Sequence, residues 1–218
     1  KVQRYEALAE MPQTKQAFIL SGYIPAKLAG KVSGYLDATY NLFVEVQDLD
    51  KEEEAPVLLE NGKASGSVEG VLASFGLPAK GEIDPSKIMF VFYVVLFGMM
   101  LSDAAYGLIM AVACQVLLKK FPRMSESMAK SLRMFMYCGI STLVWGILFG
   151  GYFGDVVTVV SRVFFGHEIT IPALWFVPLD DPMRLLIFSM LLGLIHLFTG
   201  LGLKGYMYIR DKKYLDFF

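Results

Sequence analysis

The sequence has few cysteines and few charged residues. Two cysteines among 218 residues are too few for a disulfide framework or a cysteine-based zinc site. Charged residues make up 19% of the chain and give a net charge of -1, so no general basic field favours nucleic acid. Phosphate-loop, HExxH, GxSxG and CxxC motifs are also missing. We therefore expect no catalytic residue, no metal site, no cofactor and no nucleic-acid partner.

Hydrophobic residues are abundant instead. They make up 55% of the chain, against about 45–50% in an average soluble domain, and the mean hydropathy is +0.50. The charges concentrate in residues 1–87, where acidic residues outnumber basic ones, while residues 88–218 are mostly apolar. This division predicts a soluble first part, residues 1–87, followed by a membrane domain, residues 88–218.

Residues 1–87 show the pattern of a small α/β unit. Residues 16–24 are apolar and partly β-branched, as in a buried strand, and residues 26–39 favour a helix. Residues 41–47 alternate apolar and polar side chains, as in a half-buried strand. The charge-rich residues 48–54 resemble a solvated linker. We interpret this part as the end of an α/β domain and a linker to the membrane.

Three apolar stretches occupy the membrane part, at residues 88–118, 134–153 and 185–203. A spanning helix needs about 20 apolar residues, so the second and third stretches each fit one crossing. The first would be about 46 Å long as one straight helix, too long for one crossing and too short for two full ones. A bend at Ser102 and Asp103 resolves this. We predict a mainly α membrane protein with four transmembrane helices, the first two as a tight hairpin, at about residues 88–102, 104–118, 132–154 and 183–207.

Basic residues predict the orientation. They follow the first apolar stretch and the last one, and the positive-inside rule places both groups on the cytoplasmic side. Two crossings between them satisfy that rule. The sequence shows no signal-peptide pattern at its start, which favours a cytoplasmic first part and hence two crossings within residues 88–118. We expect a multi-pass protein of the cell membrane with a cytoplasmic N-terminal portion.

Two ionisable residues within the apolar stretches are candidates for an ion pathway. Asp103 is the one acidic residue in its stretch, and His196 lies within the last one. Each also has a structural interpretation, which we favour. Asp103 would cap a helix that begins at the bend, and His196 would be a hydrogen-bonded packing residue without an ionisable neighbour three or four positions away.

Glycines recur at intervals of four near the end of the second apolar stretch. Gly146, Gly150 and Gly154 would leave one helix face nearly bare of side chains. Such a face allows a neighbouring helix to approach closely, so we predict helix packing there.

Several short motifs together resemble a known family. They occur in order and cover nearly the whole chain: GYIP at residues 22–25, PVLLEN at 56–61, FGLP at 75–78, EIDP at 82–85, FGMMLSDAAYG at 97–107 and WGILFGGYFGD at 145–155. This set resembles the membrane stator subunit of rotary V/A-type ATPases, called subunit I or subunit a. Ser102 and Ala105 stand where that family usually has glycine, which leaves the turn less backbone freedom.

The resemblance implies a non-catalytic subunit of an ion-transporting rotary ATPase or ATP synthase. Its partners would be rotor ring subunits, peripheral stalk subunits and the lipid bilayer. It would anchor the half-channels for protons or sodium and connect them to the stalk. In that family a buried arginine in a late helix separates the half-channels, and neither Arg184 nor Arg210 matches that motif.

Two other functions remain open from the sequence. One is a fragment of a secondary transporter that uses Asp103 and His196 as coupling groups; an Asp103→Asn change would then abolish transport and leave assembly intact. The other is a membrane anchor whose soluble part binds a partner.

Overall fold

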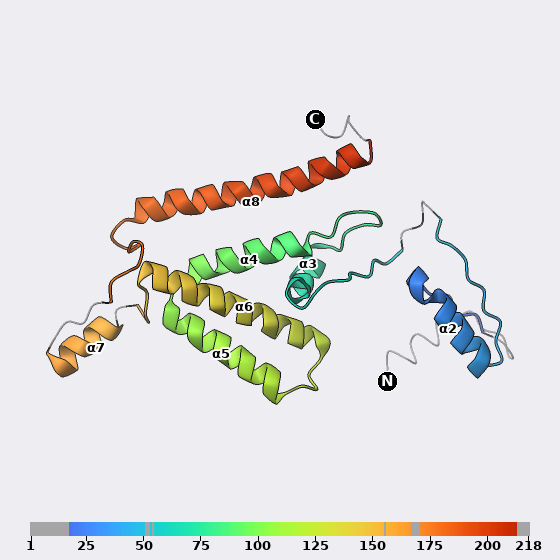
Figure 1. The fold of residues 1–218 in the computed structure, drawn as a ribbon, viewed down its shortest axis with the longest axis horizontal. Coiled ribbons are helices and arrows are strands. Elements are labelled where there is room, and N and C mark those ends of the chain that lie inside the picture. Colours follow the sequence, from blue (N-terminus) through green and yellow to red (C-terminus); the bar gives the residue numbers. More distant parts are fainter. Residues whose placement is uncertain (1–17, 51–52, 54, 155, 167–170, 213–218) are drawn as a thin grey trace. The chain divides into compact units, whose positions relative to one another are not determined.

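The computed structural model describes residues 18–50, 53, 55–154, 156–166 and 171–212 (Figure 1). The chain divides into two compact units, Lys1–Leu58 and Leu59–Phe218. The predicted division near residue 87 concerns a soluble part and a membrane domain, and it stays a prediction. Residues after Leu59 join the second unit because they carry Val68, which is fully buried among its helices.

The first unit contains one described helix, α2 (Ala26–Thr39), as the sequence predicted. Neither expected strand is formed in the residues that the structure describes. Residues 16 and 17 lie outside the described residues, residues 18–24 contain a single bridge position, and residues 41–47 have no regular structure. The described residues of this unit form no core: α2 has no buried residue, and Phe43 is 90% exposed. A strand pair without a covered face is only marginally stable, so the predicted α/β remnant is not confirmed.

All regular elements in the described part of the second unit are helices, which confirms the mainly α prediction. Its elements, in chain order, are η1 (Ser65–Val68), α3 (Glu69–Phe75), α4 (Ser86–Leu101), α5 (Ala104–Lys120), α6 (Glu126–Phe149), α7 (Val156–Phe165) and α8 (Pro182–Arg210).

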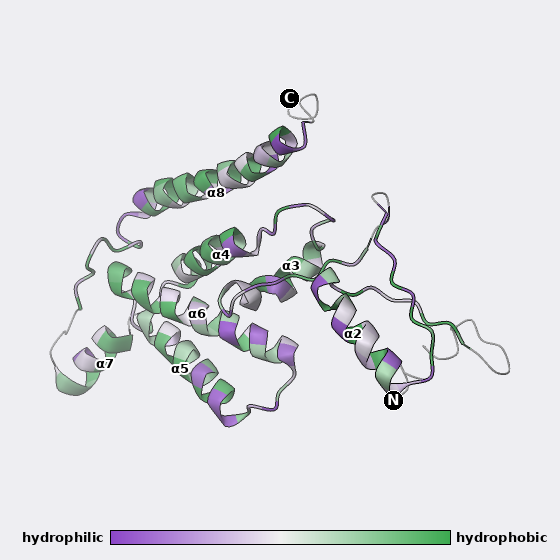
Figure 2. Ribbon diagram, turned by 45° about the vertical axis from the view of Figure 1, so that its right-hand side comes forward, coloured by the Kyte–Doolittle hydropathy of each residue, from purple (hydrophilic) through white to green (hydrophobic). Residues whose placement is uncertain are grey.

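Helix α6 lies between α4 and α5 and packs against both (Figures 1 and 2). The expected tight hairpin is therefore wrong in one respect, because α4 and α5 pack mainly on α6 and at most marginally on each other. Small residues explain this choice. An added Cβ at Gly98 of α4 would come within 2.7 Å of the Ser141 backbone, and one at Gly107 of α5 would come within 2.7 Å of the Gly139 carbonyl oxygen. Glycine lets α6 approach both helices at backbone distance.

The segment before α4 is fastened to the same bundle. Val68 is buried with Met134 and Cys138 of α6. Beside it, Lys130 Nζ lies 2.7 Å from Glu69 Oε2, an ion pair that joins α6 to α3. These contacts are why the residues around α3 fold with the helices.

The start of α4 is held by Asp84, one position earlier than a standard N-cap. Its carboxylate accepts hydrogen bonds from the Ser86 backbone N–H (2.9 Å) and from Asn61 Nδ2 (2.7 Å). Partial burial acts to raise the pKa of the Asp84 carboxyl, but the hydrogen bonds from Ser86 and Asn61 outweigh it and hold the pKa below its usual value. Asp84 therefore ties the preceding segment to the first apolar helix.

Helices α6 and α8 are long and apolar enough to cross a membrane, and α4 and α7 are shorter apolar helices. The apolar window of α8 has no buried residue, and Figure 2 shows hydrophobic colouring along most of this helix. Helix α6 begins at Glu126, six residues before the predicted start, because Ser125 Oγ caps it through the Met128 N–H. It ends at Phe149, because Gly150 adopts a left-handed conformation with φ of 76°.

Candidate functional site

The candidate site is the bend between α4 and α5. Helix α4 ends at Leu101, and Ser102 adopts a left-handed conformation with φ of 40° and ψ of 38°. Helix α5 begins two residues later with Asp103 as its N-cap. Asp103 Oδ1 accepts hydrogen bonds from the backbone N–H groups of Ala105 (3.0 Å) and Tyr106 (3.2 Å). The left-handed residue stops one helix and the aspartate starts the next.

The same aspartate binds a loop far away in the sequence. Asp103 Oδ2 accepts a hydrogen bond from the Gly154 N–H at 3.1 Å, in the turn after α6. A second hydrogen bond joins the same two segments: the Ala104 N–H donates to the Gly151 carbonyl oxygen at 2.8 Å. Asp103 is only 9% exposed. Oδ1 thus caps α5, and Oδ2 holds the bend against the turn after α6.

The three predicted packing glycines have three different roles. Gly146 lies in α6 directly beneath the bend, where an added Cβ would lie 2.5 Å from the Asp103 carbonyl carbon and clash with the Ala104 nitrogen. Gly150 and Gly154 lie beyond the end of α6, so the prediction of one continuous helix face is wrong for them. Gly150 ends the helix and faces Ala173, whereas Gly154, with φ of 60°, has open space beside it and donates to Asp103.

An aromatic cluster below the bend was missed as a packing unit. The structure brings Trp175 and Phe176 onto Phe149 at the end of α6, with ring centroids 6.0 and 5.1 Å away. The backbone N–H of Trp175 donates to the Leu148 carbonyl oxygen at 2.9 Å, which fastens this loop to the end of α6. Phe188 of α8 joins the cluster, 5.1 Å from Trp175.

His196 lies elsewhere. Its ring is exposed on α8 and stands 4.6 Å from the ring of Phe92 in the middle of α4. Phe92 precedes Asp103 by eleven positions, which corresponds to about 16 Å along a helix. The structure therefore does not bring the two ion-pathway candidates into one site.

The bend is suited to a structural role, and we refer to Asp103 with its three backbone N–H donors as the clamp. A carboxylate that accepts three backbone N–H groups is suited to fixing the position of a chain. No group of three metal-ligating side chains occurs in the part of the chain that the structure describes. The geometry fixes two helices and a loop relative to α6.

By length and composition, two helices of the described residues fit the class of membrane proteins, and one of them has no buried residue in its apolar window. No protein-family model matches it. It is 31% identical to the A-type ATP synthase subunit I of Methanocaldococcus jannaschii over 223 aligned residues, covering 91% of this chain and 32% of the relative. It is 30% identical to the subunit of the same name from Thermococcus kodakarensis, covering 88% and 30%.

A bacterial relative agrees: the V-type ATP synthase subunit I 2 of Treponema pallidum is 29% identical over 66% of this chain and 34% of its own length. The chain belongs to the subunit I family of A-type and V-type ATP synthases. It spans about a third of the length of the relatives it matches.

Proposed function

We propose that this chain forms part of the membrane stator of a rotary ATP synthase or ATPase. Helices α4, α5, α6 and α8 would anchor the ion half-channels in the membrane, and the N-terminal portion would connect them to the peripheral stalk on the cytoplasmic side. The match to subunit I relatives across 91% of the chain carries this proposal. In this role the chain is a non-catalytic subunit, and ions cross at its contact with the rotor ring.

The bend at Ser102 and Asp103 supports two short crossings by α4 and α5. Helix α4 has 16 residues and α5 has 17, so each is about 25 Å long. This length is slightly short for a 30 Å core, which a membrane accommodates by local thinning. The bend would then lie at the membrane face opposite the loop between α5 and α6. Two crossings would leave the N-terminal portion and that loop on the same, cytoplasmic side.

The two arginines of α8 support a scaffold role rather than a role in ion conduction. Arg184 pairs with Asp181 at 3.6 Å in the first turn. Arg210 pairs with Asp211 at 2.8 Å and donates to the Gly81 carbonyl oxygen at 2.6 Å. Both are therefore engaged at the helix ends. Neither would then be the arginine that separates the half-channels in the family that the sequence resembles.

Purification in mild detergent tests this proposal. We expect the tagged full-length subunit to retain rotor ring and peripheral stalk subunits, identified by mass spectrometry, because a stator must hold both. A tagged membrane protein of similar size from the same cells serves as the control and should retain neither. Recovery of the subunit alone, together with Asp103-dependent solute uptake in proteoliposomes, would instead establish the transporter alternative.

A further inference from the structure

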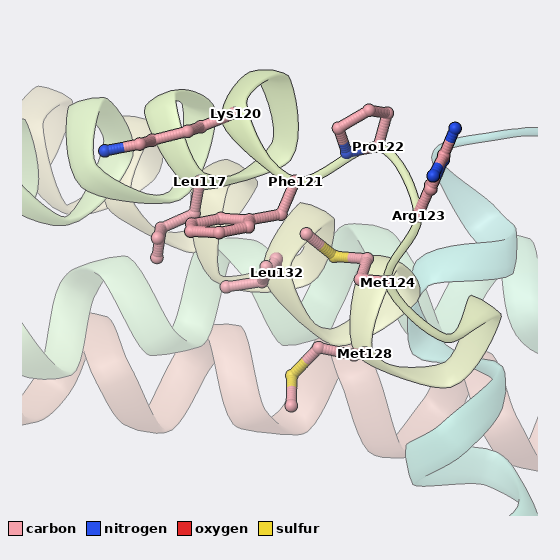
Figure 3. Close-up of a pocket in the computed structure, with 8 residues that line it drawn as sticks. All are labelled: Leu117, Lys120, Phe121, Pro122, Arg123, Met124, Met128 and Leu132. Atoms are coloured by element: carbon pink, nitrogen blue, oxygen red, sulfur yellow. The ribbon is translucent and has the colours of Figure 1, made fainter.

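An open groove lies at the connection between α5 and α6 (Figure 3). It is separate from the Asp103 bend, which lies at the other end of α5. Its volume is about 690 Å³, within the range of about 300–1,000 Å³ typical of small-molecule sites. The last turn of α5, the connecting loop and the first two turns of α6 supply its lining: Leu117, Lys120, Phe121, Pro122, Arg123, Met124, Met128 and Leu132.

The walls of the groove are apolar and open. Leu117 is 40% exposed, Phe121 is 51% exposed and Met128 is 55% exposed. Figure 3 shows Leu117, Phe121 and Met124 grouped beside Leu132. Covering such exposed apolar side chains with hydrocarbon is favourable, because it removes their surface from water. The groove is therefore suited to the chain of a lipid at the point where α6 enters the membrane.

Two cations flank these walls. Lys120 and Arg123 stand on either side of the apolar group in Figure 3, and both are exposed. Neither makes an ion pair with the residues that the structure describes, whereas nearby Lys130 is held by Glu69 at 2.7 Å and Glu126 at 3.1 Å. Lys120 Nζ lies over the Phe121 ring, 6.0 Å from its centroid. No carboxylate of the described residues pairs with Lys120 or Arg123, so both can pair with an anion from outside the chain.

We propose that this groove binds an anionic phospholipid. The lipid phosphate would pair with Lys120 and Arg123, and a hydrocarbon chain would lie against Leu117, Phe121 and Met128. Charge complementarity favours an anionic lipid over a zwitterionic one, and open apolar walls favour a lipid over a free phosphate. The inference rests on the proposed function in one respect, since it requires α6 to cross the membrane.

Native mass spectrometry of the full-length subunit in detergent tests the site, with phosphatidylglycerol and phosphatidylcholine titrated separately. We expect the first phosphatidylglycerol to bind more tightly than the first phosphatidylcholine. Lys120→Gln with Arg123→Gln should raise the Kd for phosphatidylglycerol about tenfold, since each basic residue at a membrane surface contributes several-fold. A matched pair, Lys87→Gln with Lys204→Gln, removes the same charge outside the groove and should change that Kd less than about twofold.

The remaining outcomes separate the possible occupants. Equal affinity for both lipids, or equal weakening by both variant pairs, would overturn the groove proposal. Displacement of the bound lipid by millimolar sn-glycerol 3-phosphate would overturn it as well, because that compound offers the phosphate without the chains. Equal affinity leaves the proposed function intact, whereas a full-length subunit that fails to fractionate with membranes would contradict both.

Discussion

Replacing Gly146 with alanine is expected to destabilise the helical unit by at least about 2 kcal/mol, at the upper end of what overpacking costs. The new methyl group would lie 2.5 Å from the Asp103 carbonyl carbon and 2.6 Å from Ala104 Cα. These are backbone atoms, so no side-chain rotation relieves the clash. The bend would have to move away from α6, which breaks the Ala104 bond to Gly151. Thermal unfolding in detergent, followed by circular dichroism, measures the effect.

Gly193→Ala is the matched control for this change. Gly193 lies within α8 and has no atom within 4 Å of an added Cβ. Alanine also has a higher helix propensity than glycine, by about 1 kcal/mol. We therefore expect the Gly193 variant to be as stable as the wild type or slightly more stable. Similar stability of the two variants would show that the bend does not lie on Gly146 as described.

Replacing Asp103 with alanine is expected to lower stability by about 3 kcal/mol, because hydrogen bonds to a charged group contribute about 1.5–3 kcal/mol and the cap is lost as well. Asp103→Asn should lower stability by about half as much. The oxygen of its side-chain amide can still accept from the N–H groups of α5, but the NH₂ group would then face the Gly154 N–H, donor against donor. Both variants should also incorporate poorly into the assembled complex. The stability measurement is combined with blue-native electrophoresis.

Asp181→Ala provides the control, because Asp181 caps α8 through the Arg184 N–H at 3.2 Å and its side chain is about half exposed. It should cost only about 1 kcal/mol, the usual value for a lost N-cap. The transporter alternative makes the opposite prediction for Asp103→Asn, namely normal stability and assembly with no transport. That result would remove the structural role of the bend.

The bend and the apolar helices could be predicted because their signals are local. One charged residue in a long apolar stretch, preceded by serine, is sufficient to indicate where α4 ends and α5 begins. The helix at Ala26–Thr39 likewise follows from local propensity. Strands at residues 16–24 and 41–47 depend instead on partners and on a covered face, and the residues that the structure describes in the first unit supply no such core.

The tertiary contacts of the site could not be predicted from the sequence, for a different reason. The glycine spacing predicts close packing but not where α6 ends, and Gly150 ends it by adopting a positive φ. The bond from Gly154 to Asp103 joins residues 51 positions apart, and no periodicity reports such a pair. The same holds for the stacking of Trp175 on Phe149, in which aromatic residues suited to a lipid interface cover a helix terminus instead.

The most direct test of this account is the compartment of each connecting segment, read by single cysteines in a background without Cys114 and Cys138. The variants Phe43→Cys, Arg123→Cys and Leu179→Cys each place a thiol at an exposed position. With a membrane-impermeant maleimide on intact cells, the account predicts labelling at position 179 alone, and labelling at 43 and 123 only after permeabilisation. Labelling of position 43 in intact cells would mean that the segment from α4 to α5 crosses the membrane once, which contradicts the hairpin and the orientation built on it.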